Sequence, residues 1–219
     1  MTQTERDALL DAALAHVPFD GMNQAALLAG AQDIGMSVGM AHVHFPQGGA
    51  GLAAAYHRRA DAGLRDALRE SPLKGRFRDQ VAEAVWQRLQ LVEPELVRAG
   101  AATLSLPYHA PLAGRLVWET ADTIWDALGD TSDDVNWYSK RATLSAVVSA
   151  SVLFWLGDES EGRAETRAFI DRRIDGVMRF ESLKANLRKL PFAQPLTKAA
   201  FGWIHAPKDR ELPGKTTNH

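Results

Sequence analysis

The segment Gly39-Met40-Ala41-His42-Val43-His44-Phe45-Pro46 ends the second of two short helices that we expect over residues 23–32 and 37–42. Gly35 separates the two helices. An earlier helix is expected over residues 5–16, ending before Pro18, because the residue that precedes a proline avoids helical geometry. Short helices joined by a glycine-containing turn predict a helix-turn-helix unit at the start of the chain.

Helical periodicity continues along the chain, and no segment alternates apolar and polar residues for long enough to predict a strand. Pro72, Pro94 and Pro111 each stand where the first turn of a helix tolerates a proline. We therefore predict an all-α fold of about nine to ten helices, with the later ones over residues 48–70, 72–91, 94–106, 111–128, 134–156, 162–189 and 195–205. The predicted units are a helix-turn-helix (1–57), a helical lipid-binding and dimerisation domain (58–190) and a C-terminal helix with a tail (191–219).

Composition places this chain of 219 residues among ordinary globular proteins, with 46% hydrophobic and 24% charged residues. It has no cysteine, which excludes disulfides, thiolate metal sites and cysteine nucleophiles. The first residues read neither as a signal peptide nor as an Arg-rich presequence, and the longest apolar run, 142–156, is too short to span a bilayer. We expect a cytoplasmic protein.

Motifs for catalysis are missing from the sequence. There is no Gly-rich phosphate loop, no nucleophile elbow and no glutamate with a histidine three residues later. His42 and His44 are two residues apart and point in different directions from a helix, unlike the i, i+4 pairs typical of metal sites. We expect no catalytic residue, no cofactor and no metal site.

The N-terminal unit resembles the DNA-binding end of TetR-type repressors over about the first 55 residues. His42 stands at an aromatic position of that pattern, His44 and Phe45 match it, and Gln47-Gly48-Gly49 replaces a turn that normally carries lysine. Residues 1–57 contain one arginine against five carboxylates, a net charge of −4. Because duplex binding depends on Lys and Arg neutralising phosphates, we predict a degenerate helix-turn-helix that does not bind nucleic acid.

A second distinctive segment is Gly129-Asp130-Thr131-Ser132-Asp133-Asp134-Val135-Asn136-Trp137-Tyr138-Ser139-Lys140-Arg141. On a helix, Trp137 and Arg141 share a face, so the guanidinium can lie against the indole. Aromatic residues beside an arginine at a helix start are typical of interface anchors. Composition alone slightly favours the alternative, a core position for Trp137 and Tyr138.

This segment, with Phe169-Ile170-Asp171-Arg172-Arg173-Ile174 after it, closely resembles the TetR-like lipid-binding accessory family of coenzyme Q (ubiquinone) biosynthesis. The resemblance covers about residues 104–178. It implies a homodimer of TetR-like fold that binds an isoprenoid quinone or a phospholipid and works with the di-iron hydroxylase of the pathway. Carried over by position, the hydroxylase contacts are Asp134, Trp137, Tyr138 and Arg141.

Two further features suggest where a lipid and a second subunit would lie. Trp118 and Trp125 share a helix face that either lines a lipid cavity or belongs to the core. Small residues along 142–156 and an apolar face at Ile170 and Ile174 suit a dimer-forming arrangement of four helices, with a monomer core as the alternative.

The C-terminal segment carries a net charge of +4 over residues 181–219, from seven basic and three acidic residues. Its helix is short and amphipathic with a basic flank, which suits an interfacial position on an anionic membrane. Packing on the body or on the second subunit is the alternative. The predicted membrane contacts are Leu196, Ala199, Ala200, Phe201, Trp203 and Ile204.

The function expected from the residues and the resemblance is that of a non-catalytic accessory protein, peripherally associated with the inner membrane. It would bind a hydrophobic isoprenoid or quinone intermediate and present it to a hydroxylase. A TetR-family ligand-responsive transcriptional regulator is the alternative, because the two classes share a fold.

Overall fold

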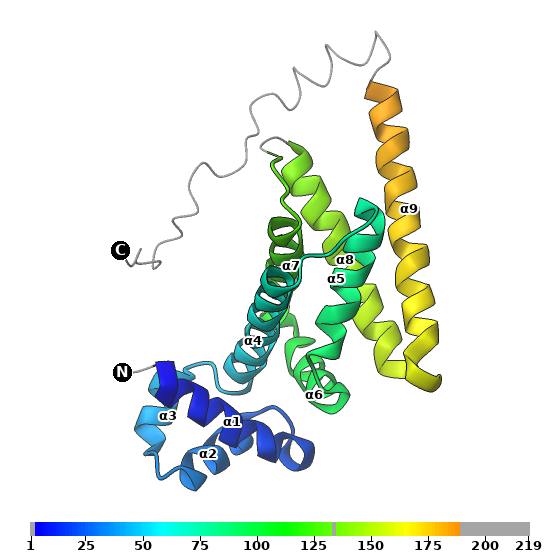
Figure 1. Ribbon diagram of the computed structural model, residues 1–219. Helices are drawn as coiled ribbons and strands as arrows, with labels where there is room; N and C mark the ends of the chain where they lie inside the picture. The colour runs from blue at the N-terminus through cyan, green and yellow to red at the C-terminus, as the bar shows by residue number, and fades with distance from the viewer. Residues whose placement is uncertain (1–2, 133–134, 189–219) are drawn as a thin grey trace.

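The computed structural model describes residues 3–132 and 135–188, and every regular element in these residues is helical (Figure 1). The predicted all-α class and number of helices are confirmed for this part of the chain. The predicted contacts at Asp134 and in the C-terminal helix (Leu196, Ala199, Ala200, Phe201, Trp203 and Ile204) lie outside the described residues. The α-helices are α1 (Gln3–Asp20), α2 (Gln24–Asp33), α3 (Val38–His44), α4 (Gly49–Glu70), α5 (Phe77–Gln90), α6 (Pro94–Leu104), α7 (Ala110–Ala127), α8 (Val135–Gly157) and α9 (Ala164–Arg188).

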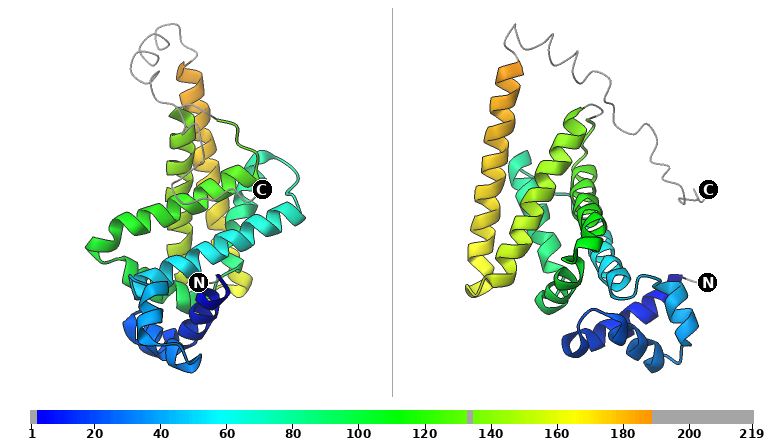
Figure 2. Two further views of the ribbon diagram at one scale, coloured as in Figure 1. Left: turned by 90° about the vertical axis from the view of Figure 1, so that its left-hand side faces the viewer. Right: turned by 180° about the vertical axis from the view of Figure 1, so that it is seen from behind.

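Helices α1, α2 and α3 form a small unit at one end of the molecule (Figures 1 and 2). Asn23 caps α2 by accepting the backbone N–H groups of Ala25 (2.7 Å) and Ala26 (3.3 Å), and Ser37 caps α3. Such caps satisfy backbone donors that a helix start leaves unpaired. The helices begin where the sequence predicts because these two polar side chains define their starts.

Close packing in this unit depends on two glycines. Gly30 lies so near α1 that a β-carbon would overlap the backbone of Ala13, and Gly49 has the same relation to the backbone of Met22. Backbone atoms cannot move aside as a flexible side chain does. Gly30 therefore lets the second half of α2 approach α1, and Gly49 lets the start of α4 approach the residues just before α2.

Helix α4 continues from this unit into the body without a break, and the expected boundary at residue 57 lies inside it. Two clusters of buried residues pack along it. Leu52 belongs to the first, with α1, α2 and Leu96 of α6, and Leu64 belongs to the second, with α5, α7, α8 and α9. One rigid helix thus contributes to both cores.

Helices α8 and α9 lie side by side along one flank of the body (Figure 2). Ile170 and Ile174 of α9 are completely buried inside the chain, at 0% and 1% exposed. The expectation that this apolar face forms a dimer interface is wrong for these two residues, because α5 and α8 already cover it. None of the described helices combines the length and apolar character needed to cross a bilayer.

Two helix bounds differ from the prediction by more than two residues. Helix α1 continues through Pro18 to Asp20, since a proline in the last turn removes only one backbone hydrogen bond. Helix α5 begins at Phe77, not at Pro72, because Gly75 adopts φ +102°, outside the helical region.

Candidate functional site

Helices α4 to α8 surround a cavity of about 350 Å³. This volume is at the small end of the range of small-molecule sites, roughly 300–1,000 Å³. Its walls are predominantly aliphatic, with contributions from Val85, Leu89, Leu96, Leu116, Val117 and Val152. The cavity suits an apolar molecule or part of one.

Exposed residues mark the mouth of the cavity. Ala101, Ser105 and Leu153 line it and are themselves solvent-exposed. Leu153 is 70% exposed, which is unusual for a large aliphatic side chain beside an apolar cavity. The interior is therefore reached across an apolar rim.

A buried ion pair lies at the polar end of this cavity. Arg88 of α5 donates from Nε to Oδ1 of Asp61 on α4 at 2.6 Å, and both residues are almost completely buried, at 6% and 3% exposed. Arg88 also donates from Nη2 to the backbone carbonyl of His57 at 3.0 Å. Buried charges require such pairing because desolvation is costly.

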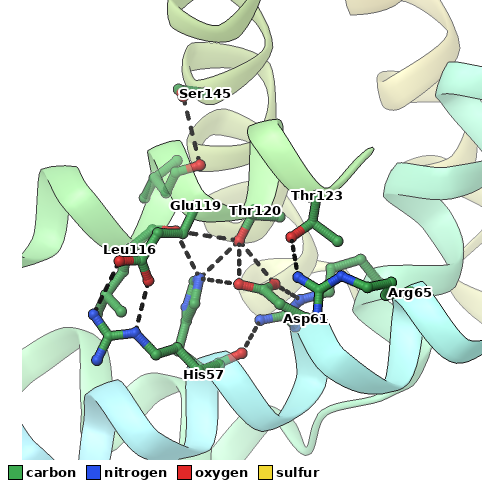
Figure 3. Close-up of polar contacts among 11 residues, drawn as sticks. His57, Asp61, Arg65, Leu116, Glu119, Thr120, Thr123 and Ser145 are labelled. Carbon is green, nitrogen blue, oxygen red and sulfur yellow. Dashed lines mark hydrogen bonds and ion pairs between the residues drawn. The ribbon is translucent and has the colours of Figure 1, made fainter. Parts of the chain in front are cut away.

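Two further side chains complete this polar cluster (Figure 3). Thr120 of α7 donates its hydroxyl hydrogen to Asp61 at 2.9 Å, and Nε2 of His57 lies 2.7 Å from the Thr120 hydroxyl and 3.1 Å from the carbonyl oxygen of Leu116. A carbonyl only accepts, so Nε2 carries a hydrogen. Burial lowers the pKa of His57 and outweighs the opposing charge of Asp61, which keeps the ring uncharged at neutral pH.

The predicted interface segment forms a second cluster at the start of α8. Arg141 is completely buried and donates from Nε to Asp122 (2.5 Å) and from Nη1 to Asp130 (3.0 Å), with Asp126 at 3.4 Å. Its guanidinium lies 4.0 Å from the centre of the Trp137 ring, which confirms the predicted stacking. A fully buried arginine cannot reach a partner, so the expectation that Arg141 is itself a contact residue is corrected: it supports the residues around it.

Aromatic rings lie around the buried guanidinium of Arg141. The centres of the Trp118 and Trp137 rings are 5.9 Å apart, and those of Trp137 and Tyr138 are 4.8 Å apart, edge to face. Tyr138 is exposed and Trp137 is half-buried. We name Trp118, Trp137 and Tyr138 the aromatic patch; its rings form a rigid, partly exposed apolar surface.

Neither of the two tryptophans predicted to line a lipid cavity lines the cavity beside Arg88, although Trp125 lines a separate cavity of about 130 Å³. Trp118 belongs to the aromatic patch, and Trp125 stacks on Phe77 in the core at a ring-centre distance of 5.6 Å. The cavity of about 350 Å³ instead meets α7 at Leu116, Val117 and Thr120. Helix α7 has apolar residues on two faces. The prediction selected the face of Trp118 and Trp125, whereas the cavity lies beside the face of Leu116 and Val117.

The sequence patterns did not single out His57, Asp61, Arg88 and Thr120. A signal was present for Arg88, because it follows Val81 and Val85 on the buried face of α5, where a charged residue is unusual. Asp61 similarly occupies the apolar face of α4. From the sequence, Arg88 and Asp61 could each have been predicted to be a buried charged residue, but their pairing with each other could not.

Asp130 provides a test of the Arg141 cluster. Burial alone would raise the pKa of Asp130, but hydrogen bonds from Lys140, Ser132 and Arg141 outweigh burial and hold that pKa below its usual 3.8. A depressed pKa contributes stability above the unfolded value, and this contribution is lost as the pH falls through the folded value.

We expect Asp130→Asn to be less stable than the parent protein by an amount that is largest above about pH 4 and shrinks in more acidic solution. Urea unfolding at pH 7, 5, 4 and 3 measures this difference. Asp66→Asn, on the exposed face of α4, is the control. A difference that stays constant with pH would contradict the assignment.

The fold and the cavity place this chain among the TetR-like helical proteins. A solved structure described as the TetR transcriptional regulator from Nitrosomonas europaea superposes with a TM-score of 0.60, covering 79% of this chain and 97% of that one, at 19% sequence identity. That likeness concerns the fold alone.

Sequence comparison then identifies the family. The COQ9 family model matches residues 110–181. The mitochondrial ubiquinone biosynthesis protein COQ9 of Drosophila melanogaster is 32% identical over 185 residues, which are 81% of this chain and 56% of that protein. The corresponding protein of Schizosaccharomyces pombe is 31% identical over 80% of this chain and 71% of its own length.

This chain belongs to the COQ9 family. The human member is 29% identical over 78% of this chain and 56% of its own length. The chain thus spans little more than half the length of several relatives that it matches.

Proposed function

We propose that this chain is a non-catalytic, lipid-binding accessory protein of ubiquinone biosynthesis. It holds an isoprenoid quinone intermediate or a phospholipid at the inner-membrane surface and presents it to a partner hydroxylase. Membership of a family whose relatives are named ubiquinone biosynthesis proteins supports the pathway. The observation that carries lipid binding is the aliphatic cavity with its exposed rim at Leu153.

Lipid retention tests this proposal directly. We expect native mass spectrometry and organic extraction of the purified protein to reveal an isoprenoid or a phospholipid. Val152→Trp, which fills the cavity from α8, should reduce the extracted amount at least severalfold while the helical circular dichroism is kept.

Val43→Trp, at an exposed position of α3 away from the cavity, is the matched control and should retain the lipid. A parent protein from which no lipid is recovered, and which binds none when incubated with it, would overturn the proposal.

The partner is proposed to dock on the aromatic patch. Rigid aromatic side chains that are partly exposed provide most of the binding energy in many interfaces. Trp137 and Tyr138, with Asp134, are the proposed contacts for a di-iron hydroxylase, and buried Arg141 holds Trp137 in place. A homodimer remains part of this proposal.

We expect Trp137→Ala to keep the fold and the oligomeric state while weakening hydroxylase binding by tenfold or more, since aromatic anchors typically contribute at least 2 kcal/mol. Surface plasmon resonance with the purified hydroxylase measures the affinity, and circular dichroism checks the fold. Tyr108→Ala removes an exposed aromatic ring outside the patch and should bind normally. Global unfolding of the Trp137 variant would instead assign that residue to the core.

A ligand-responsive regulator is the second candidate, because regulators of the TetR class share this fold. The charges of the N-terminal unit argue against a DNA-binding regulator. The exposed residues of α3, the helix that would enter the major groove, include apolar Val38, Met40 and Val43, and no Lys or Arg occurs between residues 7 and 57. A gel shift at low salt that shows specific binding to genomic fragments would reverse this preference.

A further inference from the structure

The polar end of the cavity contains one group whose hydrogen bonds are incomplete. Arg88 uses Nε for Asp61 and Nη2 for the His57 carbonyl, and no hydrogen bond from Nη1 to any described residue is found. Arg88 lines the cavity and its side chain is more than nine-tenths buried. A guanidinium has five N–H donors, so those on Nη1 remain for a ligand or for water in the cavity.

The other polar groups of the cluster are already paired. Thr120 donates to Asp61 and lies within hydrogen-bond distance of His57, and Nε2–H of His57 has the Leu116 carbonyl and the Thr120 hydroxyl as acceptors. Within this cluster the guanidinium is therefore the donor left to face the cavity, whose lining also includes the hydroxyl-bearing residues Tyr56 and Ser149. A ligand placed here needs an acceptor oxygen, not a donor.

The charge of the cluster further restricts which head groups the cavity can bind. Arg88 is balanced by Asp61 at 2.6 Å, and His57 is uncharged, so the cluster is neutral as a whole. A phosphate or carboxylate placed in the cavity would bring an uncompensated charge into apolar surroundings, at a large desolvation cost. An uncharged oxygen, such as a carbonyl or a methoxy group, accepts the hydrogen bond without that cost.

We propose that Arg88 binds the uncharged, oxygen-bearing head group of an apolar ligand in this cavity, and that the neutral cluster selects such a head group over an anionic one. This inference rests on the proposed lipid-binding function and defines the binding subsite within it. The limited volume accommodates a substituted ring and the beginning of a tail, and the remaining tail leaves across the rim at Leu153.

Three probes with the same ten-carbon tail separate the contribution of uncharged oxygens to binding from those of an apolar ring and of an anionic group. Decylubiquinone carries uncharged ring oxygens, decylbenzene carries a ring without oxygen, and decyl phosphate carries an anion. Each probe displaces the uncharged fluorescent reporter N-phenyl-1-naphthylamine from the full chain. We expect decylubiquinone to bind at least tenfold more tightly than either other probe.

Arg88→Lys keeps the charge that pairs with Asp61 and removes the forked Nη donors. It should weaken decylubiquinone about tenfold and leave decylbenzene within twofold. The double variant Arg88→Gln/Asp61→Asn avoids an unpaired buried charge and should show the same selective loss, which keeps the test valid if the lysine variant folds poorly. Arg58→Lys, on the exposed side of α4 and paired with Glu119, is the matched control and should change neither affinity.

The outcomes are distinguishable. Equal affinities for decylubiquinone and decylbenzene in the parent protein, or equal losses for both in the Arg88 variants, would overturn the subsite while leaving lipid binding in place. Tighter binding of decyl phosphate would overturn the selection for an uncharged head. Failure of the parent protein to bind any probe or the reporter would overturn both the subsite and the proposed function.

Discussion

Arg141→Ala is expected to lower the free energy of unfolding by about 3–5 kcal/mol, the usual cost of removing one partner from a buried ion pair. The change removes the guanidinium that Asp122, Asp126 and Asp130 share. Among the described residues it leaves the buried carboxylate of Asp130 with Lys140 as its one cationic partner. It also removes the support beneath Trp137. The start of α8 should lose its fixed position on α7.

Urea unfolding followed by far-UV circular dichroism measures this loss, and near-UV circular dichroism reports the surroundings of the tryptophans. Arg69→Ala is the control, because Arg69 pairs with Asp66 on the exposed face of α4 at 3.7 Å, where such pairs contribute no more than about 1 kcal/mol. Similar stabilities for the two variants would show that the aspartates do not depend on Arg141.

Gly30→Ala is the second change with a large expected effect, about 3 kcal/mol or more of local stability in the N-terminal unit. The added methyl group would overlap the backbone of Ala13, so α1 and α2 would have to move apart. Separation exposes the buried residues between them, among them Leu9 and Leu27. Overpacking against a backbone has no inexpensive relaxation.

Hydrogen exchange of the α1–α3 amides measures this effect, because the unit can open while the body stays folded. Gly39→Ala is a matched control: it makes the same substitution in α3, where a β-carbon meets no atom within 4 Å. Alanine there should be neutral or stabilise the helix by up to about 1 kcal/mol. Equal exchange rates in the two variants would contradict the role of Gly30.

Local chemistry was readable from the sequence where it acts within a few residues. The helix starts predicted at Asn23 and Ser37 and the stacking of Arg141 under Trp137 depend on neighbours up to four positions away. Helix periodicity identified the elements for the same reason. The errors at Pro18 and Pro72 arose because a proline permits a helix start or end without requiring one.

The cavity was not predictable from the same patterns. Periodicity shows that a helix has an apolar face. A cavity forms where the facing side chains leave space unfilled, and here those side chains come from five helices. Trp125 and Val117 both lie on apolar faces of α7, yet only Val117 faces the cavity. The ion pair of Asp61 with Arg88 joins positions 27 residues apart, which a single sequence does not relate.

The cavity also has a thermodynamic consequence for how much of the protein survives in a cell. A ligand that binds only the folded chain adds RT ln(1 + [L]/Kd) to its stability, about 2.7 kcal/mol at one hundred times the dissociation constant. That is a considerable share of the total stability of a typical domain. Under the proposed lipid-binding function, the supply of ligand would therefore shift the balance between folded chain and proteolysis, and a shortage of ligand would lower the amount of the protein.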